Sequence, residues 1–266
     1  MSGLWHRFYL FIDTMPRRTP SLLVLLIALT WTPLGAQEFT LIRGDIPLLV
    51  VSPHGGTREA AGLPIRNKED SQDPHFTRSR DMLTAELAEQ LRADFPEGRR
   101  PSVLVAHLHR RYFDLNRSPH RAAETTEARD AHRRFHQALT GELERLLEQH
   151  SWALLLDIHG NSSEPFDLVI GTRQGGTVSN WGERALWGPG GLVEVMREAG
   201  FTVSPNSSEE RIRFNGGYIV GHYGSDPSVD AWQLEHGKEL RFSRERNELY
   251  TKTLARFLLR AVETKR

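Results

Sequence analysis

Two apolar runs in this sequence end at a histidine that is followed by glycine. His54 follows the run at 46–52, and His159 follows the run at 152–158. A histidine at the end of a buried strand, next to glycine, has open space in front of its ring, and neutral imidazole is a preferred zinc ligand. The alternative is that each histidine only caps a turn, but two such sites together favour a metal centre.

Asp157 stands two residues before His159. On a strand the side chains alternate between faces, so both residues point to the same side. A carboxylate beside a metal-bound histidine commonly fixes the tautomer and orients the ring. The alternative is a polar pair that only completes the strand end.

A third cluster contains Asp114, Asn116 and Arg117. Arginine presents a planar fork that suits a carboxylate, and the adjacent asparagine can add a further donor. The alternative is a structural salt bridge between Arg117 and Asp114.

Glu235 follows the apolar residues Ala231, Trp232 and Leu234. A carboxylate near a metal site can act as general base and then as general acid. The alternative is a surface acid, and the apolar neighbours argue against it.

Short apolar runs alternate with segments of helical periodicity, which predicts an α/β sandwich with a largely parallel sheet. In such sheets ligands bind beyond the carboxyl ends of the strands, where the polar clusters stand. The expected strands are residues 46–52, 102–107, 152–158, 166–171, 201–204, 217–220 and 231–234, and the expected helices are 81–95, 122–149, 191–199 and 242–262.

Composition narrows the class of protein. The 266 residues include 34 Lys and Arg and 34 Asp and Glu, so no overall basic field would recruit nucleic acid. There are no cysteines, which excludes thiolate nucleophiles and cysteine zinc sites. No phosphate loop, dinucleotide fingerprint or serine nucleophile elbow is present.

The N-terminus carries Arg17 and Arg18, then an apolar run at 22–29 and the small residues Gly35 and Ala36. This pattern is typical of a secretory signal peptide, and the run is short for a membrane span. We therefore expect a signal peptide at 1–36, a single catalytic domain at 37–266, a periplasmic or secreted protein, and no membrane attachment after cleavage. An uncleaved anchor and a translation start at Met15 are the alternatives.

Taken in order, Pro-His-Gly-Gly at 53–56, Asp-Leu-Asn-Arg at 114–117, Asp-Ile-His-Gly at 157–160 and Gln-Leu-Glu at 233–235 resemble the N-formylglutamate amidohydrolase family. That family is distantly related to the zinc carboxypeptidases. The resemblance implies a three-layer α/β sandwich with a mixed, largely parallel sheet. It also implies that His54 and His159 are metal ligands. It implies that Asn116 and Arg117 bind the substrate carboxylate, and that Glu235 is the general base.

One position departs from the carboxypeptidase pattern, which has a glutamate three residues after the first histidine. Here that position is Thr57. Asp81, which opens an expected helix, and Glu59, which is close in sequence, are the two candidates for the carboxylate ligand, and we prefer Asp81.

The resulting hypothesis is a Zn²⁺-dependent hydrolase of an amide bond in an N-acyl amino acid or small peptide that bears a free carboxylate. Arg111 is one candidate for stabilising the oxyanion. Because the chain has the pattern of an exported protein, a cell-wall peptide carboxypeptidase or amidase is an alternative. A periplasmic binding protein that keeps the pocket without catalysis is another.

Overall fold

The computed structural model describes residues 37–265, and the predicted signal peptide lies outside the described residues. The strands are β1 (Phe39–Ile42), β2 (Leu48–Ser52), β3 (Ser102–Ala106), β4 (Ala153–Gly160), β5 (Leu168–Gly171), β6 (Val203–Ser204) and β7 (Val229–His236). The helices are α1 (Thr84–Ala93), α2 (Pro119–Ala122), α3 (Thr126–His150), α4 (Arg184–Trp187), α5 (Leu192–Glu198), α6 (Tyr218–Tyr223), α7 (Lys238–Phe242) and α8 (Arg244–Thr264).

The seven strands form one mixed sheet in the order β1-β3-β2-β4-β7-β5-β6. Neighbours β3, β2, β4 and β7 are parallel, whereas β1 pairs antiparallel with β3 and β5 pairs antiparallel with β7. The central strands are almost entirely buried because helices cover both faces, as parallel sheets require, and their polar residues are concentrated toward the carboxyl ends of β4 and β7. The predicted α/β sandwich with a mixed, largely parallel sheet is confirmed.

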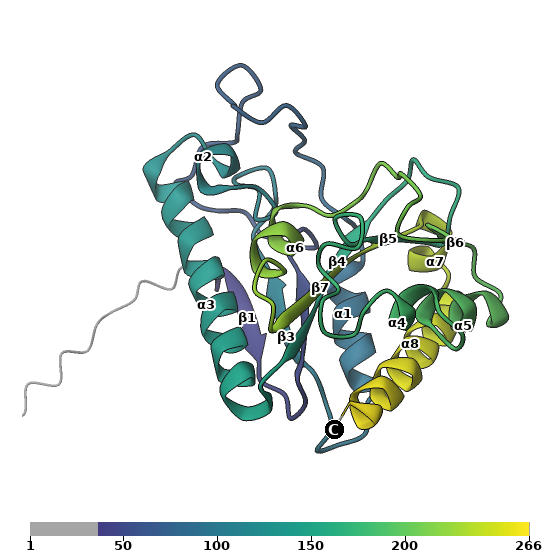
Figure 1. Cartoon of the computed structure of the whole chain (residues 1–266). Coiled ribbons are helices and arrows are strands. Elements are labelled where there is room, and N and C mark those ends of the chain that lie inside the picture. The colour runs from purple at the N-terminus through teal and green to yellow at the C-terminus, as the bar shows by residue number, and fades with distance from the viewer. Residues whose placement is uncertain (1–36, 266) are drawn as a thin grey trace, which may run out of the picture. The chain divides into compact units, whose positions relative to one another are not determined.

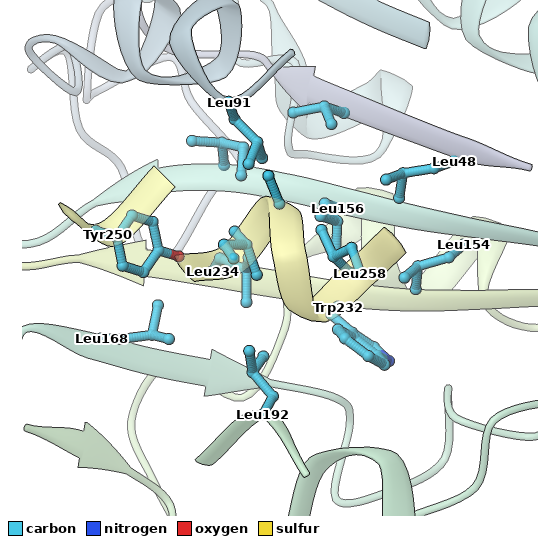
Figure 2. Close-up of a cluster of buried hydrophobic side chains, with 14 of the residues drawn as sticks. Leu48, Leu91, Leu154, Leu156, Leu168, Leu192, Trp232, Leu234, Tyr250 and Leu258 are labelled. Atoms are coloured by element: carbon cyan, nitrogen blue, oxygen red, sulfur yellow. The ribbon is translucent and has the colours of Figure 1, made fainter. Parts of the chain in front are cut away.

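Two apolar clusters fill the layers on either side of the sheet. One lies between the sheet and α1, α5 and α8, and the other lies between the sheet and α3 and α6 (Figure 1). Figure 2 shows ten labelled residues of the first cluster: Leu48, Leu91, Leu154, Leu156, Leu168, Leu192, Trp232, Leu234, Tyr250 and Leu258. Each fully buried leucine contributes about 2 kcal/mol of hydrophobic stabilisation.

The two long helices begin at capping side chains. Thr125 Oγ1 accepts the Ala128 N–H at 3.3 Å at the start of α3, and Ser243 Oγ accepts the Arg246 N–H at 3.3 Å at the start of α8. These bonds satisfy backbone donors that have no partner within a helix's first turn. None of the helices within residues 37–265 combines the length and apolar character needed to span a membrane.

The expected strand at 217–220 is wrong, because these residues lead into helix α6. Ile219 and Val220 favour a strand by their branched side chains. The fold overrides this preference, since Asn116 Oδ1 accepts the Ile219 N–H at 2.8 Å in the first turn and both apolar side chains are buried. Strand β1, which is only half-buried at the sheet edge, was not predicted.

Candidate metal and catalytic site

The carboxyl ends of three adjacent parallel strands carry the polar side chains. His54 follows β2, His159 is near the end of β4, and Glu235 is near the end of β7. His159 and Glu235 are paired directly in the register of β4 and β7. Three residues that are far apart in the sequence therefore meet at one edge of the sheet.

Asp81 joins the two histidines from just before α1, which begins at Thr84 and not at Asp81 as expected. Its backbone N–H donates to the His54 carbonyl at 2.9 Å, which brings the beginning of the helix against the loop after β2. Gly55 permits this approach, because a Cβ there would lie 2.7 Å from the Ala85 nitrogen. Asp81 Oδ2 then lies 3.0 Å from His159 Nδ1 and 3.5 Å from His54 Nδ1, and the two Nδ1 atoms are 3.2 Å apart.

The outer nitrogens of both rings face carboxylates. His54 Nε2 is 2.7 Å from Asp114 Oδ1, and His159 Nε2 is 3.0 Å from Asp157 Oδ2. A carboxylate can only accept, so these contacts favour a proton on each Nε2. In the neutral rings both Nδ1 lone pairs then point at each other and at an Asp81 oxygen, an arrangement that calls for a cation between them.

The local field also favours positive charge at this point. Burial alone would lower the pKa of His159, but the carboxylates of Asp157, Asp81 and Glu235 outweigh it and raise that pKa well above its usual value. Burial would likewise raise the pKa of Asp81, and its bonds to His159 and His54 lower that pKa instead. His54, Asp81 and His159 form the cluster whose ligand atoms, all within 4.8 Å, could hold a metal ion.

Glu235 is a buried carboxyl beside this cluster. Burial raises its pKa to about 7, against the opposing attraction of a charged His159. Gln233 Nε2 donates to Glu235 Oε1 at 2.8 Å and orients the group. A carboxyl whose pKa lies near neutrality can both take up and release a proton, which is the requirement for general acid–base catalysis.

Asn116 lies inside the site and supports it. Its Nδ2 donates to Asp157 Oδ2 at 3.2 Å, and its Oδ1 accepts from the backbone of α6. The same Nδ2 lies 2.9 Å from His159 Nε2, which carries the proton that faces Asp157 and so does not accept from the amide. Gly217 packs directly on the amide, where a Cβ would clash. Both polar groups of this amide are engaged within the protein, so a substrate carboxylate could bind Asn116 only by displacing one of these contacts.

Arg117 pairs with Asp73 and not with Asp114, because its Nε donates to Asp73 Oδ2 at 2.9 Å. Arg111 is placed away from the cluster and contacts Glu59 and Tyr112 near the surface. Glu59 is exposed and pairs with Arg111, so it does not approach the histidines. Of the two carboxylate candidates, the structure therefore brings Asp81 to the cluster.

Two residues that have clear places in the metal site were assigned no part in it from the sequence. Arg110 donates to Asp114 Oδ2 at 2.9 and 2.7 Å, and its Nη1 is 3.7 Å from Asp81 Oδ1. Arg110 therefore lies beside the metal-site candidate, where the sequence analysis expected Arg111. Asp114 bridges His54 and Arg110. The signal for Asp114 was its position two residues before Asn116, since both side chains turn inward from the same irregular segment.

Comparison with known proteins points to the same family as the sequence motifs. Residues 121–240 match the family model of N-formylglutamate amidohydrolase. N-formylglutamate deformylase from Pseudomonas aeruginosa is 29% identical over an alignment that covers 73% of this chain and 81% of that protein. The resemblance to the N-formylglutamate amidohydrolase family is confirmed. The matched segment contains His159 and Glu235, whereas His54 and Asp81 precede it.

Solved structures share the fold. The crystal structure of N-formylglutamate amidohydrolase from Ralstonia eutropha JMP134 has a TM-score of 0.59 at 20% identity and covers 85% of this chain and 98% of its own. A gene product from Agrobacterium tumefaciens has a TM-score of 0.58 at 12% identity and covers 86% and 96%. At these identities the likeness concerns the fold alone. The family matches support a hydrolase of the N-formylglutamate amidohydrolase type.

Proposed function

We propose that this chain is a zinc-dependent hydrolase that cleaves an amide bond in an N-acyl amino acid or small peptide bearing a free carboxylate. The observation that carries the proposal is the convergence of His54 Nδ1, His159 Nδ1 and Asp81 Oδ2 beside a buried Glu235. Three protein ligands with a fourth position left for water or substrate are typical of catalytic zinc sites.

The spacing of the three ligand atoms supports zinc. Ligands at about 2.1 Å from a tetrahedral ion lie about 3.4 Å from each other. The separations here are 3.0, 3.2 and 3.5 Å. Nitrogen and oxygen ligands of this kind suit zinc, and the carboxylates on both outer ring nitrogens hold the rings in the required tautomer.

Each residue has a role in the proposed reaction. A bound zinc ion would lower the pKa of a coordinated water and polarise the scissile carbonyl. Glu235 takes a proton from the attacking water and delivers it to the leaving nitrogen, so that one carboxyl serves both steps. Arg110 adds fixed positive charge where negative charge develops on the carbonyl oxygen. Arg117 is the side chain that we assign to the free carboxylate of the substrate.

Replacement of the proposed base tests the reaction. Glu235→Gln should bind zinc as the wild type does and lose about 10²- to 10⁴-fold in turnover, because the amide cannot accept the proton. The assay measures amine release from N-formyl- and N-acetylglutamate and from cell-wall peptides by the zinc-loaded protein. Glu144→Gln, an exposed position on α3, is the matched control. Full turnover by Glu235→Gln would refute the assignment, and zinc-loaded wild-type protein without activity on any of these substrates would favour a binding protein.

We also propose that the chain is exported, on the pattern of residues 1–36 alone. An exported enzyme meets peptides and cell-wall fragments, which is why such substrates belong in the assay. Mass spectrometry of the mature N-terminus checks the predicted cleavage after Ala36, and an intact N-terminus would favour the uncleaved anchor. Cell fractionation checks export itself, and recovery of the protein in the cytoplasmic fraction would contradict it.

A further inference from the structure

A long irregular segment, residues 58–80, connects the loop of His54 to Asp81. It contains no helix or strand and forms a long excursion near α2 (Figure 1). Its two ends are pinned to the rest of the chain. Arg58 exchanges backbone hydrogen bonds with His107 and His109 at 2.8 and 2.9 Å, and Asp81 N–H donates to the His54 carbonyl at 2.9 Å. Within the segment, the Arg66 N–H donates to the Arg111 carbonyl at 2.8 Å and Arg66 Nη1 donates to the Thr77 carbonyl at 3.2 Å. Residues 67–76 therefore lie between anchored points, and both metal-ligand candidates lie outside them.

Arg117 binds the middle of this segment through hydrogen bonds. Its Nε donates to Asp73 Oδ2 at 2.9 Å, and its Nη2 donates to the His75 carbonyl at 3.3 Å. The Asp73 side chain is only 1% exposed, while that of Arg117 is 21% exposed. The arginine that we assign to the substrate's carboxylate is thus already bound to a carboxylate of the protein itself.

A second guanidinium borders the same carboxylate. Arg66 Nη2 lies 3.9 Å from Asp73 Oδ2, and the Arg66 side chain is fully buried. Two of its nitrogens, Nε and Nη2, have no hydrogen-bond acceptor in the described part of the chain. Asp114 and Glu124 also lie 3.8 and 3.9 Å from this guanidinium, beyond hydrogen-bond distance. Buried donors normally have partners, so Arg66 has two N–H groups beside Asp73 that an additional acceptor could use.

We infer that Asp73 is an internal stand-in for the substrate's carboxylate, and that a ligand reaches Arg117 only by displacing it. The inference rests on the proposed role of Arg117. Displacement exchanges the charge-assisted pair of Arg117 with Asp73 for a pair of Arg117 with the ligand. A ligand with a free carboxylate can therefore displace Asp73, and a neutral ligand cannot. Asp73 would then determine specificity, because only a ligand with a free carboxylate could bind at Arg117.

Binding of glutarate to the zinc-loaded protein, measured by calorimetry, tests the inference. Asp73→Asn keeps the shape and removes the charge, so its Kd for glutarate should be about tenfold lower than that of the wild type. The neutral diamide of glutarate should bind both proteins equally. Asp70→Asn, at an exposed position on the same segment, should leave the Kd unchanged, and Asp73→Asn/Arg117→Gln should lose the gain. An unchanged or higher Kd in Asp73→Asn would show that the pair only holds the structure.

A second measurement uses the unaltered protein and does not depend on the variants folding. Lys68 and Arg78 are exposed trypsin sites on the segment. Glutarate should speed cleavage at these sites severalfold in the wild type, because release of Asp73 loosens the segment. Slower or unchanged cleavage would overturn the inference. Neither measurement requires turnover. Absence of hydrolysis would therefore refute only the proposed function. An active hydrolase in which glutarate changes neither the Kd comparison nor the cleavage rate would refute only the displacement of Asp73.

Discussion

Asp114 is the residue on which the geometry of the metal-site candidate depends most closely. It accepts from His54 Nε2 on one side and from Arg110 on the other. Burial would raise its pKa, but the positive charge of Arg110 and the contact with His54 hold that pKa well below its usual value. A permanently ionised carboxylate keeps the His54 proton on Nε2 and leaves Nδ1 free to bind a metal.

Asp114→Asn should therefore weaken zinc binding about 10- to 100-fold while leaving the ligands themselves intact. The neutral amide no longer selects the Nε2 tautomer of His54, and it leaves Arg110 without its partner. Zinc affinity measured by competition with a chelator checks this. Asp130→Asn, a surface position paired with Arg133, is the control, and equal affinities in the two variants would contradict the role of Asp114.

At the scale of elements, the strand ends were predictable and the irregular segments were not. The buried runs that precede His54, His159 and Glu235 end abruptly at polar residues, so their side chains could be placed at one edge of a parallel sheet. Arg110 and Arg111 are adjacent in a segment without helix or strand. Which of the two points inward depends on Asp114 and Glu59, and no periodicity in the sequence carries that information.

Helix α6 shows why local propensity failed. Its first turn is completed by Asn116, which stands 103 residues away in the sequence. The same amide approaches Asp157 and His159, so one residue couples α6 to the metal-site candidate. This long-range contact replaces the strand that the residue types alone would favour.

Asn116→Ala should lower the free energy of unfolding by about 1–3 kcal/mol, because it leaves buried polar partners unsatisfied, including the Ile219 N–H. Urea denaturation followed by circular dichroism measures the change. Asn67→Ala, where the exposed amide donates to Asp70, serves as the reference. Equal stabilities of these two variants would argue against the coupling.

At the scale of the whole molecule, the helices that cover the sheet also enclose buried titratable groups. His136 is one such group outside the site, with its ring nitrogens 2.9 Å from the Tyr223 hydroxyl and the Leu115 carbonyl. Burial, aided by the charge of His132, lowers its pKa to about 3 from the usual 6.5. The unfolded chain therefore binds a proton between pH 6.5 and 3 that the folded chain does not.

Stability should consequently fall as the pH drops from 6.5 toward 3, and His136 should contribute about 1.4 kcal/mol per pH unit within that window. Its contribution is complete above pH 6.5. The free energy of unfolding, measured by urea denaturation at several pH values from 7 to 4.5, checks the slope. His136→Gln should flatten it by up to that amount, and an unaltered slope would show that this histidine is not held neutral.

Titration of zinc into chelator-treated protein tests the central assignment most directly. The account predicts one saturable site per chain in the wild type. It also predicts that His54→Ala, Asp81→Asn and His159→Ala each lower the affinity by about 100-fold or more, since each removes one of three ligands. The contrary result would be a wild-type chain without a saturable zinc site, or a site that all three substitutions leave unchanged.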